Sequence, residues 1–188
     1  MTRHAWIRWL GVVGMSVSLA GVGLAQPEGT NTTATTRTTQ RMMPLRTGTW
    51  HGGGGVGFLA NTPDGTAFAV NLNADRFLNE HVSIGPLAQL AFTGDLAQYG
   101  LSAQAKYWMD LGTDGRTSVV WQGGVGAVRA NFQRDDTSWL IPLGVGIEHA
   151  VNSGLSVYAT FLLNFTDLNT GRGTRADVMP GVTFGVQF

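Results

Sequence analysis

The 188-residue sequence lacks cysteine, is poor in charged residues, and shows no segment of helical periodicity beyond its first 25 residues. Without cysteine there are no disulfides, no thiolate metal sites and no lipidated amino-terminal cysteine. Charged residues make up 13% of the chain, against about 25% in a typical soluble domain. The 12 basic and 12 acidic residues cancel, so electrostatics predict no nucleic-acid partner. The shortage of charge predicts that one large surface does not face water.

The amino-terminal segment predicts export. Arg3 and Arg8 precede an apolar run that ends in Gly23-Leu24-Ala25, and these are the parts of a secretory signal peptide over residues 1–25. The run falls short of the ~20 residues that a membrane-spanning helix needs. Residues 26–48 are rich in threonine and have no hydrophobic period, so we expect a disordered arm in the periplasm. An arm that binds an acidic envelope polymer through its arginines is the alternative.

From residue 49 onward apolar residues recur at every second position, which is typical of β-strands with two unlike faces. The breaks contain turn-forming residues, such as Pro63-Asp64-Gly65 and Asn152-Ser153-Gly154,. The pattern predicts eight strands: Thr49 to Asn61, Ala67 to Leu78, Val82 to Thr93, Gln98 to Leu111, Ser118 to Asn131, Ser138 to Val151, Leu155 to Thr166 and Ala176 to Phe188.

The composition of the polar face indicates which face is outside. Across these strands the polar face consists mostly of Gly, Ser, Thr, Asn and Gln, whereas a water-facing sheet would carry many Lys and Glu. Such residues suit a crowded interior, and the apolar face is then expected to contact lipid. Aromatic residues of the apolar face should form two girdles: Phe58, Phe68, Phe92, Tyr99, Trp139 and Phe165 near one end, and Trp50, Tyr107, Trp121 and Phe188 near the other.

An even number of strands can close into a barrel without edges, which a membrane requires because no water satisfies the backbone there. The sequence therefore predicts an all-β fold, a closed antiparallel up-and-down eight-stranded transmembrane β-barrel, over residues 49–188. A soluble barrel with an apolar ligand inside is the alternative that alternation alone leaves open.

The final segment Val182-Thr183-Phe184-Gly185-Val186-Gln187-Phe188 resembles the carboxy-terminal strand of the small eight-stranded bacterial outer-membrane β-barrel proteins. The resemblance covers residues 49–188 and extends to no single subfamily. It implies an integral outer-membrane protein that contacts lipid and lipopolysaccharide and is recognised by the barrel-insertion machinery through the strand ending at Phe188. The group includes structural anchors, adhesion and defence proteins, and lipid A-modifying enzymes.

Three charged residues are predicted to lie inside the barrel, in the lumen: Asp75, Lys106 and Glu148. Buried charges must pair or stay hydrated, so we expect Lys106 to pair with Glu148 or with Asp75. Eight strands enclose a space just wide enough for side chains. The cluster is therefore interpreted as a structural plug, and a proton or ion path is the alternative.

Residues for chemistry or ligand binding are few. The sequence contains no metal-binding or phosphate-binding motif, and His51, His81 and His149 all map to the periplasmic end, away from outer-leaflet lipid A. We predict no catalytic, cofactor or metal site. The predicted outer connections are short, and in the longest, Asp167 to Arg175, Arg172 and Arg175 are candidates for contacting lipopolysaccharide phosphates.

The sequence thus favours a non-enzymatic, monomeric envelope protein with a plugged lumen that supports membrane integrity or surface contacts. A lipid A-modifying enzyme and a narrow pore are the alternatives.

Overall fold

The computed structural model describes residues 47–188 except residues 113, 114 and 172. The predicted signal peptide, 1–25, and residues 26–46 of the predicted arm lie outside the described residues, so both stay predictions. Within the described ranges, no helix has the length and apolarity needed to cross a bilayer.

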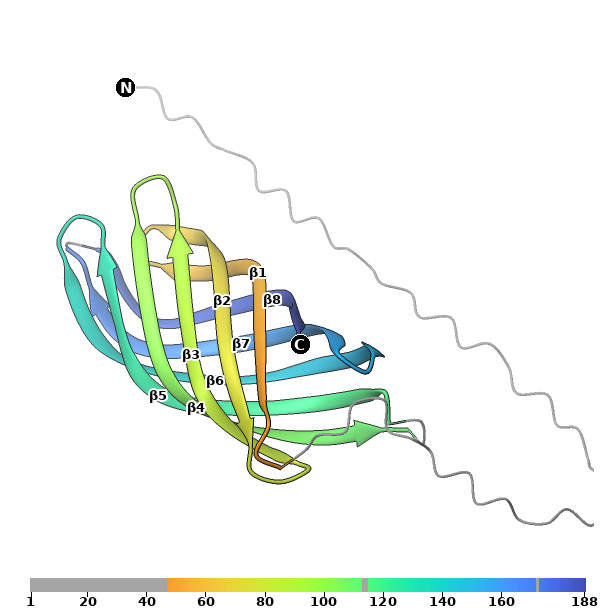
Figure 1. Ribbon diagram of the computed structural model, residues 1–188. Helices are drawn as coiled ribbons and strands as arrows, with labels where there is room; N and C mark the ends of the chain where they lie inside the picture. Colours follow the sequence, from red (N-terminus) through yellow and green to blue (C-terminus); the bar gives the residue numbers. More distant parts are fainter. Residues whose placement is uncertain (1–46, 113–114, 172) are drawn as a thin grey trace, which may run out of the picture. The chain divides into compact units, whose positions relative to one another are not determined.

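Eight antiparallel strands form one closed barrel in which each strand pairs with the next and β8 pairs with β1 (Figure 1). This confirms the predicted fold class. The strand bounds follow the predicted segments, and the largest difference is in β7, which continues to Asn169. The strands are β1 (Trp50–Thr62), β2 (Gly65–Phe77), β3 (Val82–Phe92), β4 (Ala97–Leu111), β5 (Thr117–Asn131), β6 (Asp136–Asn152), β7 (Leu155–Asn169) and β8 (Arg175–Gln187).

The up-and-down order gives the barrel two distinct ends. β1 begins and β8 ends at one of them, which we call the terminal end; the opposite end, with the connections 63–64, 93–96, 132–135 and 170–174, is the loop end. The connections use the predicted turn residues. Gly65 adopts a positive φ of 87°, and the Gly154 backbone N–H donates to Asn152 Oδ1 at 2.9 Å, as in turns closed by an asparagine side chain.

Alternation along the strands separates an exposed apolar set from a buried polar set. In β4 the outward Leu101 is 62% exposed and Tyr107 is 50% exposed, whereas the intervening Gln104 is only 4% exposed. The carboxy-terminal strand behaves in the same way, with Phe184 outward and Thr183 buried. The predicted assignment of the two faces is therefore confirmed: the apolar side chains lie on the outer wall of the barrel and the polar side chains lie in the lumen.

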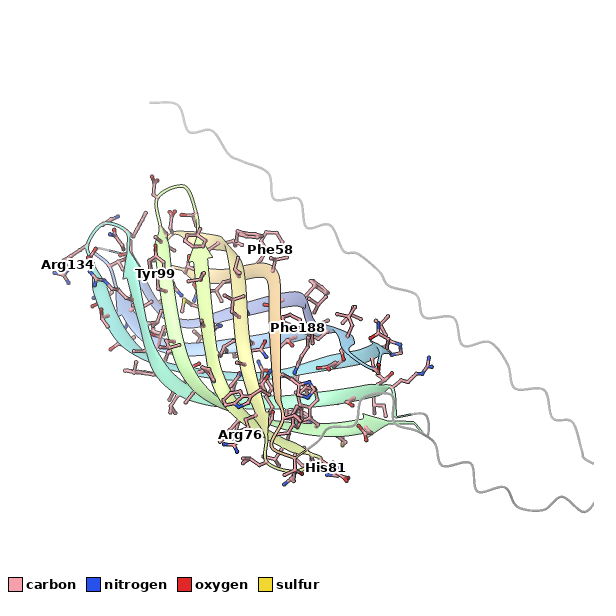
Figure 2. The ribbon with its side chains drawn as sticks, viewed as in Figure 1. Phe58, Arg76, His81, Tyr99, Arg134 and Phe188 are labelled. Carbon is pink, nitrogen blue, oxygen red and sulfur yellow. The ribbon has the colours of Figure 1, made fainter. Side chains whose placement is uncertain are left out.

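Aromatic side chains are exposed on the outer wall near both ends. At the loop end, Phe58 meets Phe68 edge to face with ring centroids 6.2 Å apart, and Phe92 meets Tyr99 in the same way at 6.1 Å. Figure 2 shows Phe58 and Tyr99 at this end of the barrel and Arg76 and His81 at the other. The predicted rings of the terminal end are also exposed: Trp50, Tyr107, Trp121 and Phe188.

Glycines on the lumen face of β1 allow close approach to β8. A Cβ atom placed on Gly57 would lie 1.8 Å from the carbonyl oxygen of Val182, and one on Gly55 would lie 2.7 Å from the Tyr158 hydroxyl. Only glycine leaves this space free. The glycine run of β1 therefore permits the close packing that the joint between the first and last strands requires.

This packing can be tested with two alanine substitutions in the same strand. Gly57→Ala should lower the free energy of unfolding by about 1–3 kcal/mol, because its methyl group overlaps backbone that cannot move freely. Gly54→Ala is the matched control, since its Cβ would point outward, 3.2 Å from the side-chain end of Leu72 and at an ordinary contact distance of 3.8 Å from the Asn71 carbonyl oxygen. Urea unfolding in lipid vesicles measures both, and equal effects would contradict the account.

Candidate functional site

The lumen is organised in three layers along the barrel. An apolar cluster fills the loop end, and its larger buried members are Leu59, Leu96, Val128, Leu140, Leu168 and Met179. A smaller apolar cluster of Phe77, Trp108 and Val120 lies towards the terminal end. The three charged residues predicted for the lumen lie between these clusters, together with amide and hydroxyl side chains, and we call this the polar layer.

Asp75 is the centre of the polar layer and is fully buried. Lys106 Nζ donates to Asp75 Oδ2 at 2.7 Å, and Asn73 Nδ2 donates to the same oxygen at 2.5 Å. The other oxygen, Oδ1, accepts from Gln104 Nε2 at 3.3 Å. Both carboxylate oxygens are therefore satisfied, which is the condition under which a buried charge is tolerated.

Gly85 makes this ion pair possible. Asp75 lies on β2 and Lys106 on β4, so the two side chains must meet across β3. Gly85 is the β3 residue opposite Gln104, and a Cβ there would lie 1.8 Å from the carbonyl oxygen of Ala74 and 3.1 Å from Asp75 Cα. The missing side chain at this point leaves room for the carboxylate to reach the two donors on β4.

Glu148 occupies the opposite wall of the polar layer. Its carboxyl group is hydrogen-bonded to the Ser156 side chain, and it lies opposite Tyr158 on β7. Of the two partners that the sequence left open for Lys106, the ion pair is formed with Asp75. The polar layer thus contains one lysine and two carboxyl groups, of which only Asp75 is bonded directly to the lysine.

Among the described residues, small cavities lie inside the lumen. One, of about 30 Å³, is bordered by Lys106, Glu148 and Tyr158, and another, of about 10 Å³, lies nearer the loop end between Leu140 and Asn164. Cavities of this size hold about one or two water molecules. Glu148 and Lys106 both border the larger cavity, so a water molecule there would be within reach of each,.

Aromatic side chains close the polar layer towards the terminal end. Lys106 Nζ lies 5.9 Å from the ring centroid of Trp108, within the range of a cation–π contact. The indole N–H donates to Ser83 Oγ at 3.1 Å. Phe77 packs between Trp108 and His51, with ring centroids 5.3 Å and 5.0 Å away. These rings place apolar surface directly beside the buried ion pair.

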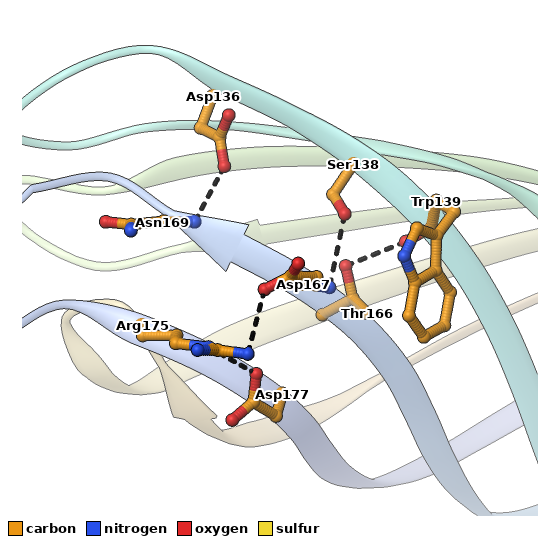
Figure 3. A network of polar contacts seen from close by, with 8 residues as sticks. All are labelled: Asp136, Ser138, Trp139, Thr166, Asp167, Asn169, Arg175 and Asp177. Carbon is orange, nitrogen blue, oxygen red and sulfur yellow. Dashed lines mark hydrogen bonds and ion pairs between the residues drawn. The ribbon is translucent and has the colours of Figure 1, made fainter.

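A second polar network lies at the loop end (Figure 3), where the pairing of β7 with β8 contains a bulge between Phe165 and Leu168. Backbone pairing of β6 with β7 ends at Leu140 opposite Thr166, and beyond it side chains of β6 bind the backbone of β7. Ser138 Oγ accepts from the Asp167 N–H at 3.1 Å, and Asp136 Oδ2 accepts from the Asn169 N–H at 2.6 Å. Backbone pairing with β8, in which Leu168 lies opposite Ala176 and Asn169 lies opposite Arg175, continues β7 to Asn169.

The predicted outer segment from Asp167 to Arg175 is therefore shorter than expected, and its assignment as one loop was wrong. Only residues 170–174 connect the strands, and Arg175 is the first residue of β8. Arg175 donates to Asp177 at 2.7 Å and pairs with Asp167 at 3.3 Å. Two carboxylates thus balance the charge that was predicted to meet lipopolysaccharide phosphates. Arg172 lies outside the described residues, and the phosphate contact stays a prediction for both.

The histidines lie at the terminal end, as their sequence positions indicated. His149 faces outward and its Nδ1 is 2.9 Å from Thr117 Oγ1, whereas the adjacent Glu148 points into the lumen. The two neighbours in sequence are therefore on opposite sides of the wall and cannot act on one substrate. In the part of the chain that the structure describes, no group of three or more His, Cys, Asp or Glu side chains is placed to hold a metal ion.

Sequence reasoning missed Asn73 and Gln104 as partners of Asp75. Their alternation in the strands placed both on the lumen face, but alternation does not give the relative depth of residues on different strands. It also missed the hydrogen bond from Asn71 Nδ2 to Thr183 Oγ1, 2.8 Å long, which joins β2 to β8 across β1.

Comparison with known proteins shows the fold. No protein-family model matches the chain, and no curated protein matches it in sequence. Neisserial surface protein A has a similar structure, with a TM-score of 0.55, 17% identity, and coverage of 73% of this chain and 94% of that one. The N-terminal β-barrel domain of Pseudomonas aeruginosa OprF is also similar, with a TM-score of 0.50, 13% identity, and coverage of 74% and 97%. The chain has the fold of small eight-stranded outer-membrane β-barrels.

The ion pair in the polar layer predicts a clear mutational pattern. Lys106→Met should lower the free energy of unfolding by about 3–5 kcal/mol, because Asp75 is left as an unpaired buried charge. Adding Asp75→Leu to the same chain should restore most of that loss. Urea unfolding of the barrel in vesicles measures the single and double variants.

Arg129→Gln provides the control for this pair. It breaks the exposed ion pair of Arg129 with Asp135, whose side chains are 63% and 49% exposed, and should change the free energy of unfolding by at most about 1 kcal/mol. A Lys106→Met variant as stable as Arg129→Gln would show that the buried pair does not hold the polar layer together.

Proposed function

We propose that this protein is an integral outer-membrane protein with a filled, non-conducting lumen that acts as a structural element of the envelope. In this arrangement the terminal end faces the periplasm and the short connections of the loop end face outward. The same proposal includes contacts with outer-membrane lipid and lipopolysaccharide, and insertion through the strand that ends at Phe188.

The composition of the outer wall is the observation that carries this proposal. Large apolar side chains are exposed around the whole barrel, among them Val56, Leu72, Leu101, Val125, Leu143, Ile147, Phe161 and Phe184. A water-exposed wall of this kind would drive association, since soluble proteins rarely expose apolar patches above a few hundred Å². Aromatic girdles at both ends match the two interfaces of a bilayer.

The filled lumen supports a structural role over a pore. Apolar clusters lie on both sides of the polar layer, and the Lys106–Asp75 pair occupies its centre. An ion that crossed the barrel would have to displace packed apolar side chains, which is costly in a close-packed interior.

The short connections at the loop end favour a role in membrane integrity over a role in binding molecules at the cell surface. Binding from such a platform usually depends on extended loops, yet the connection to β8 comprises only residues 170–174. Glu148 and His149 lie on opposite sides of the barrel wall, so these sequence neighbours give no support to catalysis. The proposal is therefore of a non-enzymatic protein.

The location can be tested in cells. We expect the protein to fractionate with the outer membrane and to migrate faster on gels before heating than after, because a closed barrel resists detergent until it is boiled. Recovery in the aqueous periplasm without heat-modifiable migration would contradict the proposed location.

The filled lumen makes a separate prediction about conductance. Purified protein in planar bilayers should show no single-channel steps above the background of protein-free bilayers. Leu140→Ala, which opens the loop-end cluster, should lower stability by about 2–5 kcal/mol without creating steady conductance, since Lys106 and Asp75 remain in place. Steady channels in the wild type would favour the pore instead.

A further inference from the structure

The outer wall of the barrel contains a concave groove over β3, β4 and β5. Its volume is about 1160 Å³ and its lining is mostly apolar. Ala103, Ala105 and Gly123 form its floor, and Leu101, Val125 and Leu143 project beside them. The groove lies on the face that the proposed function places in lipid.

The strand register explains why the wall is hollow here. Along one row of paired residues, Ile84 is opposite Ala105, Ala105 is opposite Gly123, and Gly123 is opposite Leu143. The two small residues therefore lie between two large ones on the same face. Side chains stand roughly perpendicular to a sheet, so this order leaves a depression with a wall on each side.

The same row ends on a positive charge and an indole ring. Arg76 is paired with Ile84 on one side and with Trp50 on the other, and both Arg76 and Trp50 line the groove. Arg76 is exposed and forms no ion pair with the residues that the structure describes. It lies at the terminal end of the barrel, as Figure 2 shows.

We propose that this groove is a binding site for one anionic glycerophospholipid of the periplasmic leaflet. The headgroup phosphate is bound by Arg76, whose guanidinium group offers several donors to phosphate oxygens. An acyl chain lies along the floor formed by Ala103, Ala105 and Gly123. Trp50 lies at the level of the ester groups, where indole rings are favoured.

The positive charge of Arg76 favours a lipid over a second copy of this chain as the occupant of the groove. A copy packed on the groove would bury Arg76 against an apolar wall, and an unpaired buried charge is costly. A phosphate at the membrane surface satisfies the same guanidinium without desolvating it fully. The inference rests on the proposed membrane location, because only a bilayer supplies this ligand to the outer wall.

The test uses full-length mature protein reconstituted in vesicles of equal parts phosphatidylglycerol and phosphatidylcholine, followed by native mass spectrometry after transfer to mild detergent. The wild type should retain one phosphatidylglycerol per barrel in preference to phosphatidylcholine. Arg76→Gln should reduce that retention about fivefold, the effect of one basic side chain on an anionic lipid. Ala105→Leu should abolish retention of either lipid, because it fills the floor.

Two variants serve as matched controls. Arg129→Gln removes an outward arginine at the loop end, and Ala127→Leu enlarges an outward alanine of β5 that does not line the groove. Both should retain phosphatidylglycerol as the wild type does.

Equal retention by Ala105→Leu, no preference for phosphatidylglycerol, or a dimer in place of a lipid adduct would each overturn the inference. Heat-modifiable migration is measured on the same samples. A wild type that migrates as a folded barrel but retains no lipid contradicts only the groove, whereas one that does not insert contradicts the proposed function as well.

Discussion

The pairing of β1 with β8 is the constraint on which the rest of the structure depends. It runs from Gly53 opposite Gln187 to Leu59 opposite Gly181, and Phe188 continues it by exchanging two backbone hydrogen bonds with Gly52. Closure leaves no strand with an unpaired edge, which is the condition for a sheet in hydrocarbon. It also assigns every side chain of the barrel to the lumen or to the outer wall.

Closure at eight strands makes the lumen narrow, and the narrow lumen determines its composition. Glycine is required where strands or lumen side chains approach closely, as at Gly57 beside Val182 and at Gly85 beside Ala74. Polar side chains in the lumen must form their hydrogen bonds with other lumen side chains, and Asp75 accepts from three donors. The apolar clusters on either side separate this pair from bulk water, which strengthens the attraction and raises the penalty for losing one partner.

Most of the strands could be predicted from the sequence, because the alternation of apolar and polar residues is a local property of each strand. Each strand carried its own period of two, and turn residues such as Pro63-Asp64-Gly65 marked the breaks. The partner of Lys106 did not follow, because it depends on the register of β2, β3 and β4 and on the space above Gly85. The extent of β7 was underestimated for a related reason: Asn169 looks like a loop residue, but it pairs with Arg175 on β8 past a bulge that local sequence does not reveal. Ser138 and Asp136 on β6 then bind the backbone N–H groups of Asp167 and Asn169.

The apolar outer wall is the feature of the fold on which the proposed outer-membrane location rests. The assignment of its apolar rows to lipid can be measured with single-tryptophan variants in vesicles whose acyl chains carry bromine, a quencher of indole fluorescence. Trp121 is 53% exposed on the wall and Trp108 is 2% exposed in the lumen. The account predicts strong quenching of Trp121 and little quenching of Trp108. Quenching of Trp108 with Trp121 unaffected would contradict it.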